Sequence, residues 1–120
     1  MISLYVHPTC TSCRKAVALF DDAGATVERR DYFKDRFTVE ELTAVLARAG
    51  RTPAEMLSTR ARAYRDLGIA GGDLSDDELI GLMVEEPTLL RRPLAVADGQ
   101  STVGFNAAAL TALADADAGR

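Results

Sequence analysis

Apolar residues recur with two different spacings along this chain of 120 residues. Residues 2–6 form a short apolar run, and residues 26–32 form a second stretch with strand character. Between them, apolar residues at positions 16, 17, 19 and 20 recur at helical spacing, and Gly24 is a typical helix stop. The chain therefore begins in the order β-α-β, which favours a right-handed crossover and a parallel strand pair.

Two sequence signatures for helix starts follow in the middle of the chain. Thr38 and Glu41 have the spacing of a capping box, in which each side chain accepts a hydrogen bond from the backbone of the other residue. Ser75 and Glu78 repeat the pattern. Apolar residues at helical spacing come after each box, so both predict amphipathic helices. Shorter helices are expected in two stretches between them, residues 53–57 and 63–67.

The end of the sequence combines strand and helix signals. Residues 94–97 and 101–105 are two β-like runs separated by an Asp-Gly-Gln turn, which predicts a hairpin. Asn106 is a suitable N-cap for a last helix that runs through Leu113. Residues 114–120 are small and acidic, and we expect them to form a frayed tail.

The predicted order is β-α-β, then a helical middle, then β-β-α. This order indicates one α/β domain spanning residues 1–120, with a thioredoxin-like fold that carries a helical insertion.

Composition and charge narrow the function further. The chain is 48% hydrophobic and 27% charged, which is typical of a soluble globular protein. Its net charge of −4 argues against direct binding of nucleic acid. No apolar run approaches the roughly 20 residues of a membrane span. The N-terminus lacks the features of a signal peptide, so a cytoplasmic, reducing location is expected.

The loop between the first strand and the first helix contains both cysteines of the chain, Cys10 and Cys13. Free N–H groups at a helix N-terminus carry positive partial charge and lower the pKa of a thiol placed there. Arg14 and Lys15 add positive charge nearby. The same N–H groups are suited to hold an oxyanion beside the sulfur.

The spacing of the two cysteines matches a redox-active pair. Residues three apart on a first helical turn are neighbours, and their separation fits a disulfide. Cys10, nearer the loop, is expected to be the exposed attacking thiol, and Cys13 the resolving thiol. Two alternatives are inert core cysteines and a metal site with His7, although a closed metal site needs a fourth ligand. We therefore expect no metal; His7 either tunes the pKa of Cys10 or is solvated.

Four motifs in order make the sequence similar to the ArsC/Spx family, which contains arsenate reductases and the Spx redox regulators of RNA polymerase. The resemblance covers approximately residues 2–113 and implies a thioredoxin-like fold with a helical insertion. The motifs are CTSCRKA at 10–16, LSTR at 57–60, LLRRPL at 89–94 and VGFN at 103–106.

The resemblance implies roles in arsenate reduction. Cys10 would attack arsenic, and Arg92 and Arg60 would bind the oxyanion together with the loop at Thr11 and Ser12. Planar guanidinium groups suit this role because they form paired, charge-assisted hydrogen bonds to such oxygens. A second thiol would then attack the Cys10 sulfur and release arsenite.

The sequence also departs from the glutathione-coupled reductases of the family. It has Cys13 as a second thiol, Val6 where they carry a histidine, and Phe105 near the position of a third arginine. These differences favour an internal disulfide reduced by thioredoxin, with glutaredoxin and glutathione as the other external reductants, and no bound cofactor. Pro93 resembles the cis-proline that faces the redox cysteine in thioredoxin-like folds.

The alternative is an Spx-like transcriptional regulator with a disulfide switch, which would bind the C-terminal domain of the RNA polymerase α subunit. Gly50 lies near the glycine that such proteins use for this contact. The sequence ends before the longer basic tail of Spx proteins, which favours a compact enzyme. We expect a monomer in either case.

Overall fold

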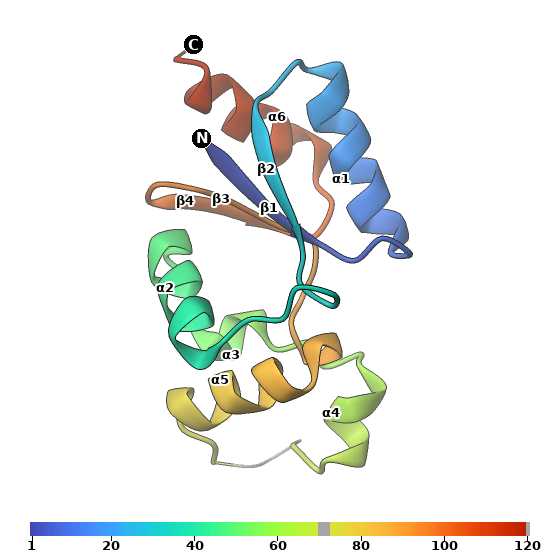
Figure 1. Ribbon diagram of the computed structural model, residues 1–120, viewed down its shortest axis with the longest axis vertical. Coiled ribbons are helices and arrows are strands. Elements are labelled where there is room, and N and C mark those ends of the chain that lie inside the picture. Colours follow the sequence, from blue (N-terminus) through green and yellow to red (C-terminus); the bar gives the residue numbers. More distant parts are fainter. Residues whose placement is uncertain (70–72, 120) are drawn as a thin grey trace.

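The computed structural model describes residues 1–69 and 73–119, and Figure 1 shows the arrangement of its elements. The predicted β-α-β start and β-β-α end are both present. The first half of the chain contains β1 (Ile2–Val6), α1 (Thr11–Asp22), β2 (Val27–Asp31), α2 (Val39–Ala49), α3 (Pro53–Met56) and α4 (Arg62–Asp66). The second half contains α5 (Asp76–Glu85), the 3-10 helix η1 (Pro87–Leu89), β3 (Leu94–Ala97), β4 (Gln100–Val103) and α6 (Ala107–Asp117).

The four strands form one sheet in the order β2-β1-β3-β4. β1 pairs with β2 in parallel, as the β-α-β order predicts, with Leu4 opposite Arg29. β3 is antiparallel to β1, with Leu4 opposite Ala95, and forms the predicted hairpin with β4. β1 is therefore a central strand, and the loop after it leaves from the middle of one end of the sheet.

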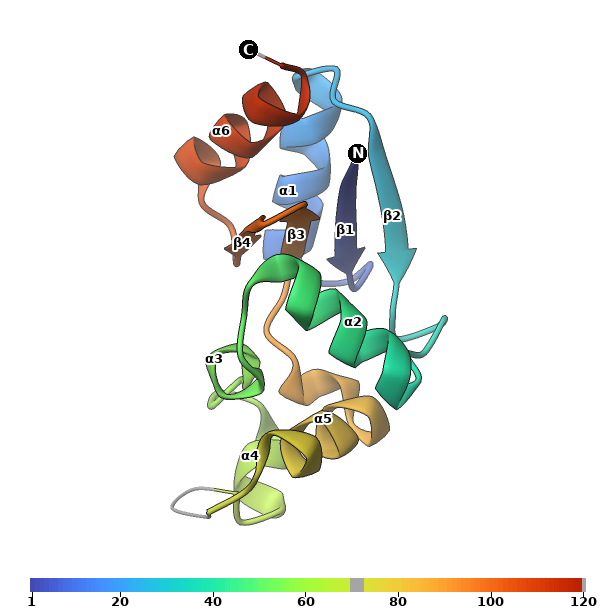
Figure 2. The same ribbon diagram turned by 90° about the vertical axis from the view of Figure 1, so that its left-hand side faces the viewer.

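Helices cover both faces of this sheet (Figures 1 and 2). α1 and α6 lie together on one face, where Phe20 and Leu110 pack with Leu4 in a core of fully buried side chains. α2 covers the other face through Leu42 and Leu46. The Cys10–Cys13 segment begins α1, so its position is determined by the packing of that helix.

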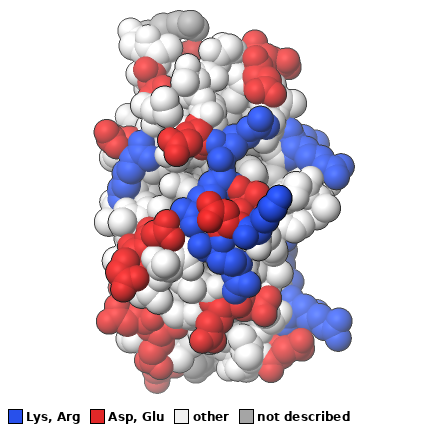
Figure 3. Space-filling model, viewed as in Figure 1, with Lys and Arg blue, Asp and Glu red and all other residues white. Residues whose placement is uncertain are grey.

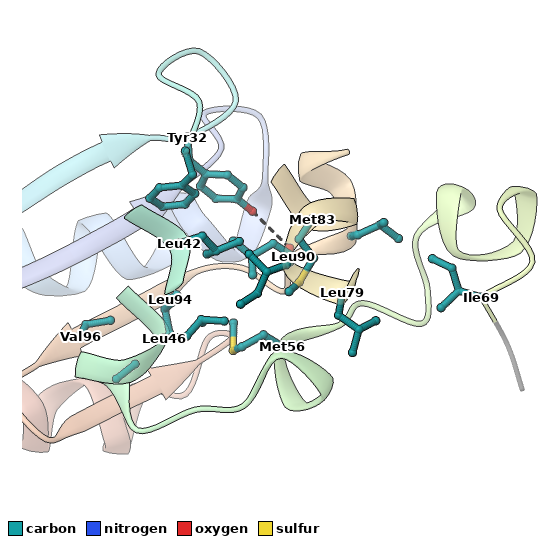
Figure 4. Close-up of a cluster of buried hydrophobic side chains, with 14 residues drawn as sticks. Tyr32, Leu42, Leu46, Met56, Ile69, Leu79, Met83, Leu90, Leu94 and Val96 are labelled. Atoms are coloured by element: carbon teal, nitrogen blue, oxygen red, sulfur yellow. Dashed lines mark hydrogen bonds between the residues drawn. The ribbon is translucent and has the colours of Figure 1, made fainter. Parts of the chain in front are cut away.

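The helical insertion extends the second core beyond the end of the sheet. Figure 4 shows Met56 of α3, Leu79 and Met83 of α5 and Leu90 directed into the same cluster as Leu42. Both capping boxes that the sequence predicts are formed: Thr38 is the N-cap of α2 and Ser75 is the N-cap of α5, each with both reciprocal hydrogen bonds. Thr52 and Glu55 form a third box at α3.

The last helix corrects one prediction. We expected a frayed tail over residues 114–120, but α6 continues to Asp117, and Ala114 is buried against the sheet. The carboxylate of Asp117 pairs with the N-terminal ammonium of Met1 at 3.0 Å, which ties the two ends of the chain together. Residue 120 lies outside the described residues. The helix continues past Leu113 because the small side chain of Ala114 packs closely against the sheet.

The second strand of the hairpin also differs from its prediction. β4 spans Gln100–Val103 instead of 101–105, because Gly104 turns out of the strand with φ +78° and donates its N–H to the Pro93 carbonyl at 2.8 Å. The turn between β3 and β4 consists of Asp98 and Gly99. As a result, Gly104 lies next to the segment that contains Arg92 and Pro93.

Charge is unevenly distributed over the surface. In Figure 3, Lys and Arg gather across the middle of this face with Asp and Glu among them, and Asp and Glu predominate in its lower left part. Arg30 joins the two regions: it pairs with Glu41 at 2.8 Å and lies over the Phe37 ring. Among the described residues, no helix has the length and apolar character needed to cross a bilayer.

Candidate active site: a dithiol beside a cationic cavity

Cys10 is the N-cap residue of α1. Its extended backbone positions the sulfur to accept a hydrogen bond from the Cys13 N–H at 3.3 Å, as an N-cap side chain does. The Cys10 N–H donates to the His7 carbonyl at 3.1 Å and so closes the loop. Both cysteines are free thiols; Cys10 is half-buried and Cys13 is buried. The helix N-terminus therefore acts directly on the Cys10 sulfur.

The two thiols have opposite pKa shifts. Burial raises the pKa of Cys13 to about 12, and its hydrogen bond with Cys10 acts in the same direction. Partial burial also acts to raise the pKa of Cys10. Hydrogen bonds from Cys13, the positive charge of Arg92 and the Ser12 N–H together outweigh this effect and hold the pKa of Cys10 below its ordinary value. At neutral pH Cys10 is thus the better nucleophile, while Cys13 keeps its proton.

Arg92 supplies the positive charge that acts on both sulfurs. Its guanidinium carbon lies 5.3 Å from the centre of the Phe33 ring, a favourable position for a cation. Its Nε is buried and has no hydrogen-bond partner among the described residues. A buried N–H donor without a partner carries a desolvation cost, which an incoming oxyanion would remove. The Arg92–Pro93 peptide bond that follows is cis.

A cavity of about 600 Å³ opens beside Cys10. It forms where two distant segments lie side by side: Leu57 and Leu90 make an antiparallel bridge, and the Ser58 N–H donates to the Leu89 carbonyl at 2.6 Å. This pairing brings the residues after α3 against those before Pro93. The cavity is lined by Cys10, Leu57, Ser58, Thr59, Arg60, Arg91, Arg92 and Gly104.

The structure brings most of the candidate residues together. Cys10, Arg60 and Arg92 line one cavity, as the proposed oxyanion site requires. Thr11 and Ser12 do not line it. They form the first residues of α1, and Ser12 acts through its backbone N–H on the Cys10 sulfur.

Three charged or titratable residues near the cysteines form contacts outside the cavity. The Arg14 guanidinium donates to the Pro8 carbonyl at 2.9 Å, and the Lys15 ammonium lies 5.8 Å from the Phe105 ring centre. The His7 ring accepts from the Thr9 backbone and packs edge-on against a phenylalanine. The His7 backbone N–H donates to the Cys13 sulfur at 3.5 Å.

Sequence reasoning missed Arg91 as a residue of the site. It lines the same cavity as Arg92. It also missed Tyr32, a buried residue whose hydroxyl donates to the Leu90 carbonyl at 3.2 Å and interacts with Arg92. The adjacency of the two arginines was the available signal for Arg91; no local pattern indicated Tyr32.

This arrangement defines a class of protein. A parallel β-α-β unit, an antiparallel hairpin, a C-X-X-C pair at a helix N-terminus and a cis-proline together make a thioredoxin-like fold. The part of the chain that the structure describes holds no cluster of three metal-binding side chains. What the site offers is a nucleophilic thiolate, a neighbouring thiol and guanidinium groups for an anion.

Comparison with known proteins identifies the family. Residues 5–113 match the ArsC family, and the chain belongs to it. It is 36% identical over 106 residues to the global transcriptional regulator Spx of Enterococcus faecalis, covering 88% of this chain and 80% of that protein. Spx of Staphylococcus aureus is 31% identical over 106 residues, covering 88% and 81% of the two chains.

A solved structure of an arsenate reductase from Vibrio cholerae has the same fold. It matches with a TM-score of 0.76 and 30% sequence identity, over 83% of this chain and 86% of that chain. The similar proteins thus include both an arsenate reductase and transcriptional regulators, so family membership alone leaves two functions to compare.

Proposed function

We propose that this protein is a thiol-dependent arsenate reductase that uses Cys10 as nucleophile and Cys13 as resolving thiol. The observation that carries the proposal is the position of an acidified Cys10 thiol in a cavity lined by three arginines. A thiolate and an oxyanion repel each other, and the guanidinium groups offset this repulsion.

In the first chemical step, the Cys10 thiolate attacks the pentavalent arsenic of arsenate. A sulfur–arsenic bond forms, and an oxygen leaves as water after protonation. Arg60 and Arg92 hold the remaining oxygens through charge-assisted hydrogen bonds and balance their negative charge. The helix N-terminus and the Ser12 N–H stabilise the sulfur until it attacks.

In the second step, Cys13 attacks the Cys10 sulfur. The sulfur–arsenic bond breaks, its electron pair goes to arsenic, and arsenic leaves in the trivalent state as arsenite. A Cys10–Cys13 disulfide remains, so the dithiol has supplied both electrons. The Cys13 proton must leave before this attack, because burial holds the pKa of Cys13 at about 12. Reduction of the disulfide by external thioredoxin, or by glutaredoxin and glutathione, completes the cycle.

Arsenate-dependent oxidation of NADPH tests this function. The reduced protein is mixed with arsenate and either thioredoxin with its reductase or glutaredoxin with glutathione and its reductase. We expect turnover that disappears in Cys10→Ser and, with thioredoxin, also in Cys13→Ser. Turnover that persists in Cys10→Ser would contradict the assignment of the nucleophile.

A second function is favoured by a different observation: the similar proteins named Spx share about a third of their residues with this chain. An Spx-like regulator would bind the C-terminal domain of the RNA polymerase α subunit in a manner that depends on the Cys10–Cys13 disulfide. Gly50 ends α2 on the outside of the molecule, with open space around its Cα. A surface near it would then form the contact.

Titration of purified α C-terminal domain into the reduced and the oxidised protein separates the two functions. Binding that changes with the redox state, combined with no arsenate turnover, would favour the regulator. Turnover without a detectable complex in either redox state would favour the reductase. The Cys13→Ser variant, which cannot form the disulfide, is the control for an effect of oxidation elsewhere.

A further inference from the structure

The cavity beside Cys10 has a charge opposite to that of the chain. The whole sequence carries a net charge of −4, yet the cavity walls contain three arginines, Arg60, Arg91 and Arg92. No Asp or Glu is among the described residues that line it. A concave wall with three guanidinium groups and no carboxylate concentrates positive potential at one point of an acidic protein.

Arg91 is held in this wall by its own backbone and side chain. Its N–H donates to the Met56 carbonyl at 2.8 Å, and its Nη1 donates to the Glu55 carbonyl at 3.2 Å. A guanidinium has five N–H donors, so this single side-chain bond leaves several directed elsewhere. The acceptor of this bond is a neutral carbonyl, and no carboxylate within residues 1–69 and 73–119 forms an ion pair with Arg91.

The charge of the anion determines how much a third guanidinium contributes. The electrostatic energy of one positive charge with a doubly charged anion is twice that with a singly charged anion at the same distance. A residue of this kind therefore affects selectivity as well as affinity. If removal of the third guanidinium weakens the binding of a dianion about ten-fold, it should weaken the binding of a monoanion in the same position about three-fold, because the interaction energy is halved.

From these observations we propose that Arg91 is a specificity-determining residue, the third guanidinium of the site, which makes the cavity prefer doubly charged tetrahedral oxyanions to singly charged anions. The proposal rests on the proposed function to the extent that the anion is held beside Cys10.

Protection of Cys10 from alkylation measures anion binding without turnover. The reduced protein is treated with the neutral reagent iodoacetamide while sulfate or nitrate is titrated at constant ionic strength. The decrease in the alkylation rate of Cys10 with anion concentration gives an apparent affinity for each anion. Each variant is compared with itself without anion, because a lost positive charge also changes the thiol. The variants are Arg91→Ala, Arg91→Lys and, as a matched control, Arg62→Ala, which removes an exposed arginine paired with Asp66.

We expect the wild-type protein to bind sulfate more tightly than nitrate, and Arg91→Ala to lose about ten-fold for sulfate and about three-fold for nitrate. Arg91→Lys should retain most of the preference, and Arg62→Ala should match the wild type. An unchanged ratio of the two affinities in Arg91→Ala would overturn the proposal, as would an equal loss in Arg62→Ala.

The same measurement separates this proposal from the proposed function. Selective protection by sulfate without arsenate turnover would leave the role of Arg91 intact and refute the reductase. Turnover of arsenate with no effect of Arg91→Ala on selectivity would support the reductase and refute the role of Arg91. Absence of protection by either anion in the wild type would overturn the proposal about Arg91.

Discussion

The difference in pKa between the two thiols predicts the relative rates at which an alkylating reagent modifies Cys10 and Cys13. With a pKa of about 12, Cys13 is only about one part in 100,000 thiolate at pH 7. Cys10 has a pKa below the ordinary value of 9.0, so its thiolate fraction exceeds about 1%. The thiolate populations therefore differ by at least about 1,000-fold.

Nucleophilicity reduces this ratio. A thiolate of higher pKa reacts faster, with a Brønsted coefficient of about 0.4–0.5. Over three pKa units, the Cys13 thiolate is therefore about 20-fold more reactive than the Cys10 thiolate. Division of about 1,000-fold by about 20-fold gives a net preference for Cys10 of about 50-fold. The 1% exposure of Cys13 increases it further, because the reagent must reach the sulfur.

Replacement of each thiol in turn tests this reasoning. The reduced wild-type protein, Cys10→Ser and Cys13→Ser are treated with less than one equivalent of iodoacetamide at pH 7, and the labelled peptides are quantified by mass spectrometry. We expect nearly all label on Cys10 in the wild type, rapid labelling of Cys13→Ser and slow labelling of Cys10→Ser. Equal labelling of the two cysteines, or preferential labelling of Cys13, would refute the account of the site.

Three further predictions follow from particular contacts. Arg92→Ala should raise the pKa of Cys10 by removing a positive charge, and should therefore move its alkylation profile to higher pH, whereas Arg92→Lys should move it less. Thr38→Ala should lower the free energy of unfolding in urea by about 1 kcal/mol, through loss of the cap of α2. A hydrogen bond from Arg30 lowers the pKa of Glu41 from 4.5 to about 2, so its stabilising effect is present above pH 4.5 and is lost as the pH falls toward 2. The thermal midpoint of Glu41→Gln should depend less on pH in that range; an identical pH dependence would contradict this role.

Local signals in the sequence predicted the parts of the fold that local interactions determine. Each capping box needs only two side chains three residues apart, and the boxes at Thr38 and Ser75 formed as predicted. The C-X-X-C pair at the start of α1 follows from the same i, i+3 geometry. The fold class could therefore be predicted before any long-range contact was known.

Long-range pairing determined what the sequence could not predict. Arg91 enters the cavity because the segments at Leu57 and Leu90 pair, and nothing near Arg91 in the sequence indicates that partner. Ala114 continues α6 because it is buried against the sheet, a tertiary effect that its small size and acidic neighbours conceal. The contact between Tyr32 and the Leu90 carbonyl likewise joins residues from opposite halves of the chain.

A single turnover without any external reductant tests the central claim most directly. The reduced protein is mixed with excess arsenate, and the products are arsenite, measured by chromatography, and the Cys10–Cys13 disulfide, measured by mass spectrometry. We predict one arsenite and one disulfide per protein chain, and neither product with Cys10→Ser. A protein that keeps both thiols reduced in the presence of arsenate, and releases no arsenite, would contradict the proposal that this dithiol reduces an oxyanion.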